Sequence, residues 1–181
     1  MPVGQTSTLL NRKPLYVGDD ITVSSVQTTG LTPSRGLNRQ IIAPGGVATV
    51  LTAAQSGSLC LWDAAAGFLY TLPAPVVGLW FEFEVTVTAT SVTHKVITDA
   101  GTTLIIGAIM ASLIATTPSS TAGPFAFSFN GTTHIACAMN GTTTQGIIGS
   151  RLRLDCINAT QWAISGLTIG SGSITTPAST S

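Results

Sequence analysis

The chain has 181 residues, a length that fits one domain with appended segments. Only 8% of its residues are charged, seven basic and seven acidic, against about 25% in an average soluble domain. A net charge of zero argues against binding to nucleic acid, which needs a basic surface to neutralise phosphates, and against binding to anionic membranes. Threonine (29 residues) and glycine (19 residues) take the place of the missing charge, so we expect a neutral surface that partner proteins cover.

The first 45 residues differ from the rest of the chain. They contain Pro14, Pro33 and Pro44, several turn sequences and no long periodic segment, although 21–26 has the pattern of a short strand. We predict that 1–45 is an extended N-terminal arm that gains order on a partner, and the alternative is a weakly patterned part of the main domain. Four of the seven basic residues lie here and are candidate interface residues: Arg12, Lys13, Arg35 and Arg39.

Short β-rich segments follow over 47–52, 58–63 and 68–72, and the clearest strand comes next, over 79–88. Its residues alternate strictly, which predicts a half-buried strand with Phe81 and Phe83 on the inner face. Trp80, Glu82 and Glu84 share the outer face. We interpret Trp80 as an interface anchor, because aromatic residues are enriched at the centres of binding surfaces. The alternative is that a second sheet or the arm covers it.

Further strands are predicted over 93–98, 103–110, 112–117, 125–129 and 134–139. His94, next to Lys95, is interpreted as a solvated strand position. The dipeptides Asn130–Gly131 and Asn140–Gly141 follow apolar segments and are strong signals for a β-hairpin.

The segment 151–157 repeats the alternation with basic residues on its polar face. Leu152 and Leu154 alternate with Arg151 and Arg153, and a shorter strand over 161–165 contains Trp162. The basic pair matches the acidic pair Glu82 and Glu84. We hypothesise that the two polar faces pair, either within one sheet or between subunits.

Many short strands, separated by turns and without a ten-residue helical period, predict an all-β fold. The pattern fits an antiparallel β-sandwich or a jelly-roll-like β-barrel over 46–168, and it does not distinguish between them. The glycine- and serine-containing segment 169–181 has the composition of a flexible C-terminal tail.

No pattern of reactive side chains indicates catalysis. The two histidines lie in no zinc-binding motif, and no nucleophile or phosphate-binding motif occurs. Cys60, Cys137 and Cys156 lie among apolar residues and are predicted to be reduced and buried, since no signal peptide is recognised. Glu82 and Glu84 could in principle serve glycoside hydrolysis, but two carboxylates on one strand face more often solvate that face. We predict no catalytic, cofactor-binding or metal site, and therefore no enzyme.

The segment 51–98 carries a resemblance to a known family. It reads LTAAQSG, then DAAAGFLYTLPAPVVGLWFEFEV, then a Thr-rich stretch and a strand with His94, and the later segment RLRLDCINATQWAIS completes the pattern. This resembles the capsid decoration (cement) proteins of tailed bacteriophages over about 47–166. The resemblance implies a β-sandwich or barrel that forms homotrimers on the outer capsid surface, between major capsid proteins.

The expected function is therefore that of a virion structural protein, made in the host cytoplasm, that stabilises the capsid. Its partners would be the major capsid protein and other copies of itself. The alternative is a trimeric fibre, spike or tail component with a receptor- or glycan-binding head, in which Trp80 stacks on a sugar. An enzyme or a secreted adhesive domain is opposed by the lack of ionisable clusters and of a signal peptide.

Overall fold

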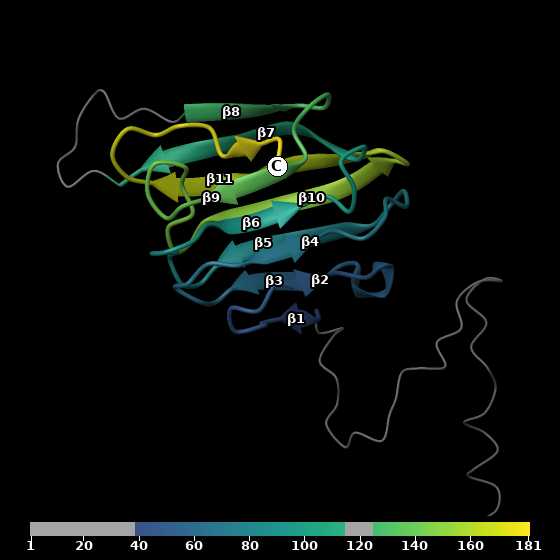
Figure 1. Cartoon of the computed structure of the whole chain (residues 1–181), viewed down its shortest axis with the longest axis horizontal. Coiled ribbons are helices and arrows are strands. Elements are labelled where there is room, and N and C mark those ends of the chain that lie inside the picture. The colour runs from purple at the N-terminus through teal and green to yellow at the C-terminus, as the bar shows by residue number, and fades with distance from the viewer. Residues whose placement is uncertain (1–38, 115–124) are drawn as a thin grey trace, which may run out of the picture. The chain divides into compact units, whose positions relative to one another are not determined.

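The computed structural model describes residues 39–114 and 125–181 (Figure 1). The segments 1–38 and 115–124 lie outside the described residues. Most of the predicted arm, with Arg12, Lys13 and Arg35, therefore falls outside them as well.

The described residues form two β-sheets that pack face to face. Sheet A has seven strands in the order β1 (Ile41–Ile42), β3 (Leu59–Trp62), β5 (Trp80–Val85), β10 (Arg151–Asn158), β11 (Gln161–Gly170), β7 (Leu104–Leu113) and β8 (Phe125–Asn130). Sheet B has five, in the order β12 (Ala178–Ser179), β9 (Ala136–Met139), β6 (His94–Ile97), β4 (Leu69–Thr71) and β2 (Thr49–Val50). The only helical element of the described residues is a single 3-10 turn, Ala53–Gln55. The predicted all-β sandwich is confirmed.

The first six strands wind as a coil, because each strand lies in the opposite sheet from the one before it (Figure 1). Neighbours within a sheet are therefore two strands apart in the sequence and run parallel: β1–β3–β5 in sheet A and β2–β4–β6 in sheet B. The later strands add antiparallel pairs, such as β5–β10 and β10–β11. Both sheets are thus mixed, whereas the sequence predicted antiparallel pairing throughout.

The two Asn-Gly dipeptides do not form β-hairpins. Asn130–Gly131 ends β8 in sheet A, and the next strand, β9, lies in sheet B. The side-chain oxygen of Asn130 instead accepts hydrogen bonds from the backbone N–H groups of Thr132 and Thr133. Asn140 likewise accepts from Thr142 and Thr144. These asparagines therefore organise turns between the sheets, which local turn signals cannot distinguish from hairpins.

The domain extends beyond both boundaries predicted for it, 46 and 168, in the structure. β1 lies within the segment assigned to the arm, and it pairs with β3 as part of sheet A. The predicted C-terminal tail begins inside β11, and its last residues form β12, which pairs with β9. The Gln145 side chain also donates a hydrogen bond to the Thr175 backbone oxygen, at 2.7 Å. Such backbone contacts hold the C-terminal segment against sheet B even though its composition is typical of a linker.

Aromatic side chains fill the core beneath β3 and β5. Phe81, Phe83 and Val85 are buried, so the alternation predicted for 79–88 is confirmed over β5. The strand ends at Val85, and Val87, predicted on the inner face, is exposed. Trp62 stacks on Phe83 with ring centroids 5.2 Å apart and meets Tyr70 of sheet B edge-on at 6.0 Å. These aromatic contacts join the two sheets. The core beneath β7 and β11 contains Ile105, Ile109 and Ile164 together with Trp162, whose ring lies 6.1 Å from that of Phe81.

Candidate interaction surface on sheet A

The outer face of sheet A brings the predicted acidic and basic pairs together. β5 and β10 are antiparallel neighbours, and their register places Arg151 opposite Glu84 and Arg153 opposite Glu82. The polar faces therefore pair within one sheet, which is one of the two arrangements expected from the sequence. The pairing follows from alternation, since opposite residues of antiparallel strands point to the same face.

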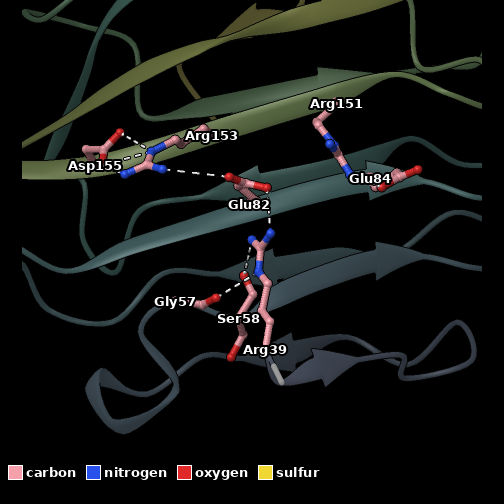
Figure 2. Close-up of polar contacts among 8 residues, drawn as sticks. All are labelled: Arg39, Gly57, Ser58, Glu82, Glu84, Arg151, Arg153 and Asp155. Atoms are coloured by element: carbon pink, nitrogen blue, oxygen red, sulfur yellow. Dashed lines mark hydrogen bonds and ion pairs between the residues drawn. The ribbon is translucent and has the colours of Figure 1, made fainter. Parts of the chain in front are cut away.

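Glu82 lies at the centre of this face and contacts two arginines (Figure 2). Arg39 approaches from one side, with 2.7 Å between Nη1 and the Glu82 carboxylate, and Arg153 from the other at 3.7 Å. Arg39 also donates hydrogen bonds to the backbone oxygens of Gly57, at 2.8 Å, and Ser58, at 3.1 Å. Arg39, which the sequence assigned to the arm, is thus held against sheet A by three acceptors.

Two further ion pairs complete the group. Arg151 contacts Glu84 at 2.6 Å, and Arg153 contacts Asp155 at 2.7 Å (Figure 2). Asp155 was not among the predicted site residues, although its alternation with Arg151 and Arg153 placed it on the same face. We refer to Arg39, Glu82, Glu84, Arg151, Arg153 and Asp155 as the charged cluster.

Trp80 is half-buried beneath two members of the charged cluster. The guanidinium carbon of Arg153 lies 4.3 Å from the centroid of the indole ring, and that of Arg39 lies 5.3 Å away. Both distances are within the range of cation–π attraction. The sequence left Trp80 as either an interface anchor or a residue covered by a second sheet or the arm. In the structure its ring is contacted by arginines of the same chain, one of which, Arg39, had been assigned to the arm.

The charges of the cluster cancel, with three cations and three anions. The hydrogen bond to Asp155 raises the pKa of Arg153, with smaller contributions from the charges of Asp155 and Glu82. Because these side chains are partly exposed, each pair is expected to contribute only about 0–1 kcal/mol to stability. The cluster therefore contributes a neutral surface whose carboxylates all have cationic partners.

The other end of sheet A has an outer face without any charged side chain. It consists of β11, β7 and β8, and the register aligns Leu167, Met110 and Ala126 across the three strands. Leu167 is 56% exposed and Met110 is 44% exposed. We call this surface the uncharged end.

His94 lies in the core, so the prediction that it is solvated is wrong. It stacks on Trp62, with ring centroids 5.7 Å apart, and its Nε2 donates a hydrogen bond to the Val87 backbone oxygen at 2.7 Å. Its Nδ1 is buried without a hydrogen-bond partner. Burial lowers the pKa of His94, which keeps the ring neutral. Alternation could not show which face of this strand is buried, because each face carries one apolar residue. Val96 shares the face of His94, and Ile97 shares the face of Lys95.

The three cysteines are free and buried, as predicted. Burial raises the pKa of the Cys60 thiol to about 12, and that of Cys137 to about 12. Protonated, enclosed thiols of this kind pack as small apolar side chains.

Within residues 39–114 and 125–181, no group of three or more His, Cys, Asp or Glu side chains is placed to hold a metal ion. The same residues contain no helix long and apolar enough to cross a membrane.

The chain matches no known protein family, no curated protein and no solved structure. The structure brings together six of the nine predicted interface residues, namely Arg39, Trp80, Glu82, Glu84, Arg151 and Arg153. The other three, Arg12, Lys13 and Arg35, lie outside the described residues.

Proposed function

We propose that this chain is a virion structural protein that binds the outer surface of a bacteriophage capsid, between major capsid proteins, and stabilises the shell. The supporting observation is the distribution of charge. Nine side chains are charged among the described residues, and six of them neutralise one another in the charged cluster. The other three are Asp63, Lys95 and Asp99.

A surface of this kind suits association with other proteins. The centres of protein interfaces are depleted in charge, because each buried charge must be desolvated. Large apolar side chains are exposed on several elements of the described surface, including Ile41, Val50 and Leu167. Covering such positions removes apolar area from water at about 25 cal/mol per Å².

A capsid presents the same contact many times, so each contact can be modest. Once one copy or one segment is bound, a linked second contact forms at a high effective concentration. A homotrimer with three attached N-terminal segments would use this effect. The trimer and the role of the segment 1–38 are both parts of the proposal.

The alternative, a fibre or spike head that binds a glycan, relied on Trp80 as a stacking platform. In the structure this ring is contacted by Arg39 and Arg153, so a sugar would have to displace a guanidinium that also pairs with a carboxylate. This geometry favours the capsid-binding proposal over the glycan-binding one.

The test is co-sedimentation of the purified protein with capsids that lack it, followed by a thermal melt of the shell. We expect saturable binding, a higher melting temperature of the shell, and weak dependence on salt because few charges enter the contact. A second protein, residues 39–181, tests the N-terminal segment while leaving Arg39 and β1 in place. We expect it to fold and bind more weakly. No binding by the full chain, or binding that disappears at moderate salt, would contradict the proposal.

A further inference from the structure

The last strand at the uncharged end of sheet A, β8, is an edge strand of the part of the chain that the structure describes. Among the described residues, β8 pairs only with β7. Its sequence, FAFSFN, contains no proline and no charged residue, two of the features that prevent edge-to-edge association. The opposite edge is shorter, because β1 has only two residues. The two edges of one sheet therefore differ in the length of backbone they offer to a partner strand.

The register between β8 and β7 determines which backbone N–H and C=O groups of β8 point away from β7. The Gly131 N–H donates to the Ile105 oxygen, and bonding positions alternate along an antiparallel pair. Phe125, Phe127 and Phe129 therefore direct their backbone groups to β7, whereas Ala126 and Ser128 direct theirs outward. The Asn130 N–H also points outward, where it donates to Nδ1 of His134 at 3.1 Å. Ala126 and Ser128 thus present two N–H and two C=O groups to a further strand.

We infer that this edge binds β8 of a second copy of the chain, antiparallel and about a twofold axis at Phe127. In this register Ala126 of each copy lies opposite Ser128 of the other. Both residues are hydrogen-bonded positions, so the pair exchanges four backbone hydrogen bonds. A register shifted by two residues would form fewer of these four hydrogen bonds, because the Asn130 N–H already donates to His134.

The side chains of β8 favour its own copy as the partner. Opposite residues of an antiparallel pair point to the same face, so centring the pair on Phe127 keeps the phenylalanines of both copies on the inner face. Ala126 and Ser128 are small and exposed, and they meet without steric conflict. No like charges meet across the axis, since the strand has no charge.

The pairing would also cover apolar area that a single copy leaves open. Phe125 is 38% exposed and Phe127 is only partly buried against the core. At the twofold axis the two Phe127 rings form a cross-strand aromatic pair, a favourable combination in antiparallel sheets.

This contact goes beyond the proposed function and does not depend on it. A twofold contact doubles the copy number, so a chain that is otherwise monomeric becomes a dimer and a homotrimer becomes a hexamer. Assembly through β8 therefore predicts an even number of copies in solution, with or without a capsid.

The first experiment compares the full chain with Ser128→Pro and Ser128→Ala by sedimentation velocity across a range of concentrations. Proline removes an outward N–H that β7 does not use, so the fold should tolerate it. Two of the four intermolecular hydrogen bonds are then lost, and the dissociation constant should rise at least about tenfold. Ser128→Ala keeps the N–H and should associate like the unmodified chain. Odd or single copies of the unmodified chain, or unchanged association of Ser128→Pro, would overturn the inference.

A second experiment tests the register and remains informative if Ser128→Pro fails to fold. Ala126→Cys and Ser128→Cys proteins are mixed and mildly oxidised. Opposite hydrogen-bonded residues have Cα atoms about 5.5 Å apart, which suits a disulfide, whereas the diagonal 126–126 and 128–128 pairs are about 7–8 Å apart. We expect the mixture to cross-link at least about tenfold more than either variant alone. The native cysteines are buried, so the unmodified chain gives a low background. Equal cross-linking in all samples, or none, would overturn the inference.

Discussion

The two ends of sheet A differ although one continuous sheet joins them. At β1, β3, β5 and β10 the outer face carries the charged cluster, the edge strand is short, and the core beneath contains Trp62 and Phe83. At β11, β7 and β8 the outer face has no charge, the edge strand has six residues, and the core beneath combines isoleucines with Trp162 and Phe129. In a chain with so few charges, neutralising them at one end leaves the other end free of the features that prevent association.

The largest expected effect comes from the aromatic core beneath the charged cluster. Trp62 contacts Phe83 in sheet A and both Tyr70 and His94 in sheet B. Trp62→Ala should lower the free energy of unfolding by about 3–5 kcal/mol, measured by chemical denaturation. Val76→Ala, at an exposed position, is the matched control and should change it by less than about 0.5 kcal/mol. Similar losses in both variants would mean that this core does not join the sheets.

A backbone contact at the uncharged end should give the next largest effect. Gly107 of β7 has φ +123°, and a Cβ atom there would lie 2.3 Å from the Ile164 backbone oxygen of β11. Gly107→Ala should therefore destabilise the fold by about 1–3 kcal/mol or more, measured as a lower denaturation midpoint. Gly101, which has open space around it, is the control, and Gly101→Ala should be close to neutral. A neutral Gly107→Ala would show that β7 and β11 are not packed this closely.

The buried histidine predicts a pH dependence. Burial lowers the pKa of His94 in the folded state, so the unfolded chain binds the proton more readily. Well above pH 6.5, the approximate pKa of histidine in the unfolded chain, the titration of His94 does not change the free energy of unfolding. Below that pH the free energy of unfolding falls, by up to about 1.4 kcal/mol per pH unit. The loss levels off below the folded pKa.

The measurement is the free energy of unfolding at pH 7.5 and pH 5.5 for the unmodified chain and for His94→Gln. Glutamine can still donate to the Val87 oxygen but does not titrate. We expect a smaller difference between the two pH values in the variant. An equal difference would place the titrating group elsewhere.

The smallest effect is expected from the charged cluster itself. In a double-mutant cycle, Arg151→Ala and Glu84→Ala should show a coupling energy of about 0.2–1 kcal/mol that shrinks as salt is added. A coupling of several kcal/mol would mean that the cluster stabilises the fold and does not simply neutralise its surface.

The sequence predicted the elements whose periodicity is strong. The alternation over 80–85 and 151–156 correctly assigned buried and outer residues, and the matching of two carboxylates with two arginines anticipated the pairing of β5 with β10. It failed at Val87, which was predicted to face inward and is exposed, because the strand ends at Val85. Features that depend on distant contacts were not predictable. The parallel coil is one of them, because its turns differ in length: Ile41 pairs with Leu59 and Leu59 with Glu82, so no constant repeat exists.

Local signals were misleading where tertiary structure overrides them. Asn130–Gly131 indicated a hairpin, yet the chain crosses to the other sheet at this point. His94 was assigned to the surface because polarity alone cannot show that Trp62 and Phe68 enclose it. The composition of 169–181 resembled a linker, although its backbone pairs with β9.

The central proposal is that this chain acts by coating a phage capsid. It is tested most directly by the copy number of the chain in purified particles of a phage whose genome encodes it. Quantitative mass spectrometry against the major capsid protein provides that number. The proposed function predicts a ratio near one, or a simple fraction of one. A few copies per particle would assign the protein to a tail or fibre, and its absence from the particle would contradict any role in the virion.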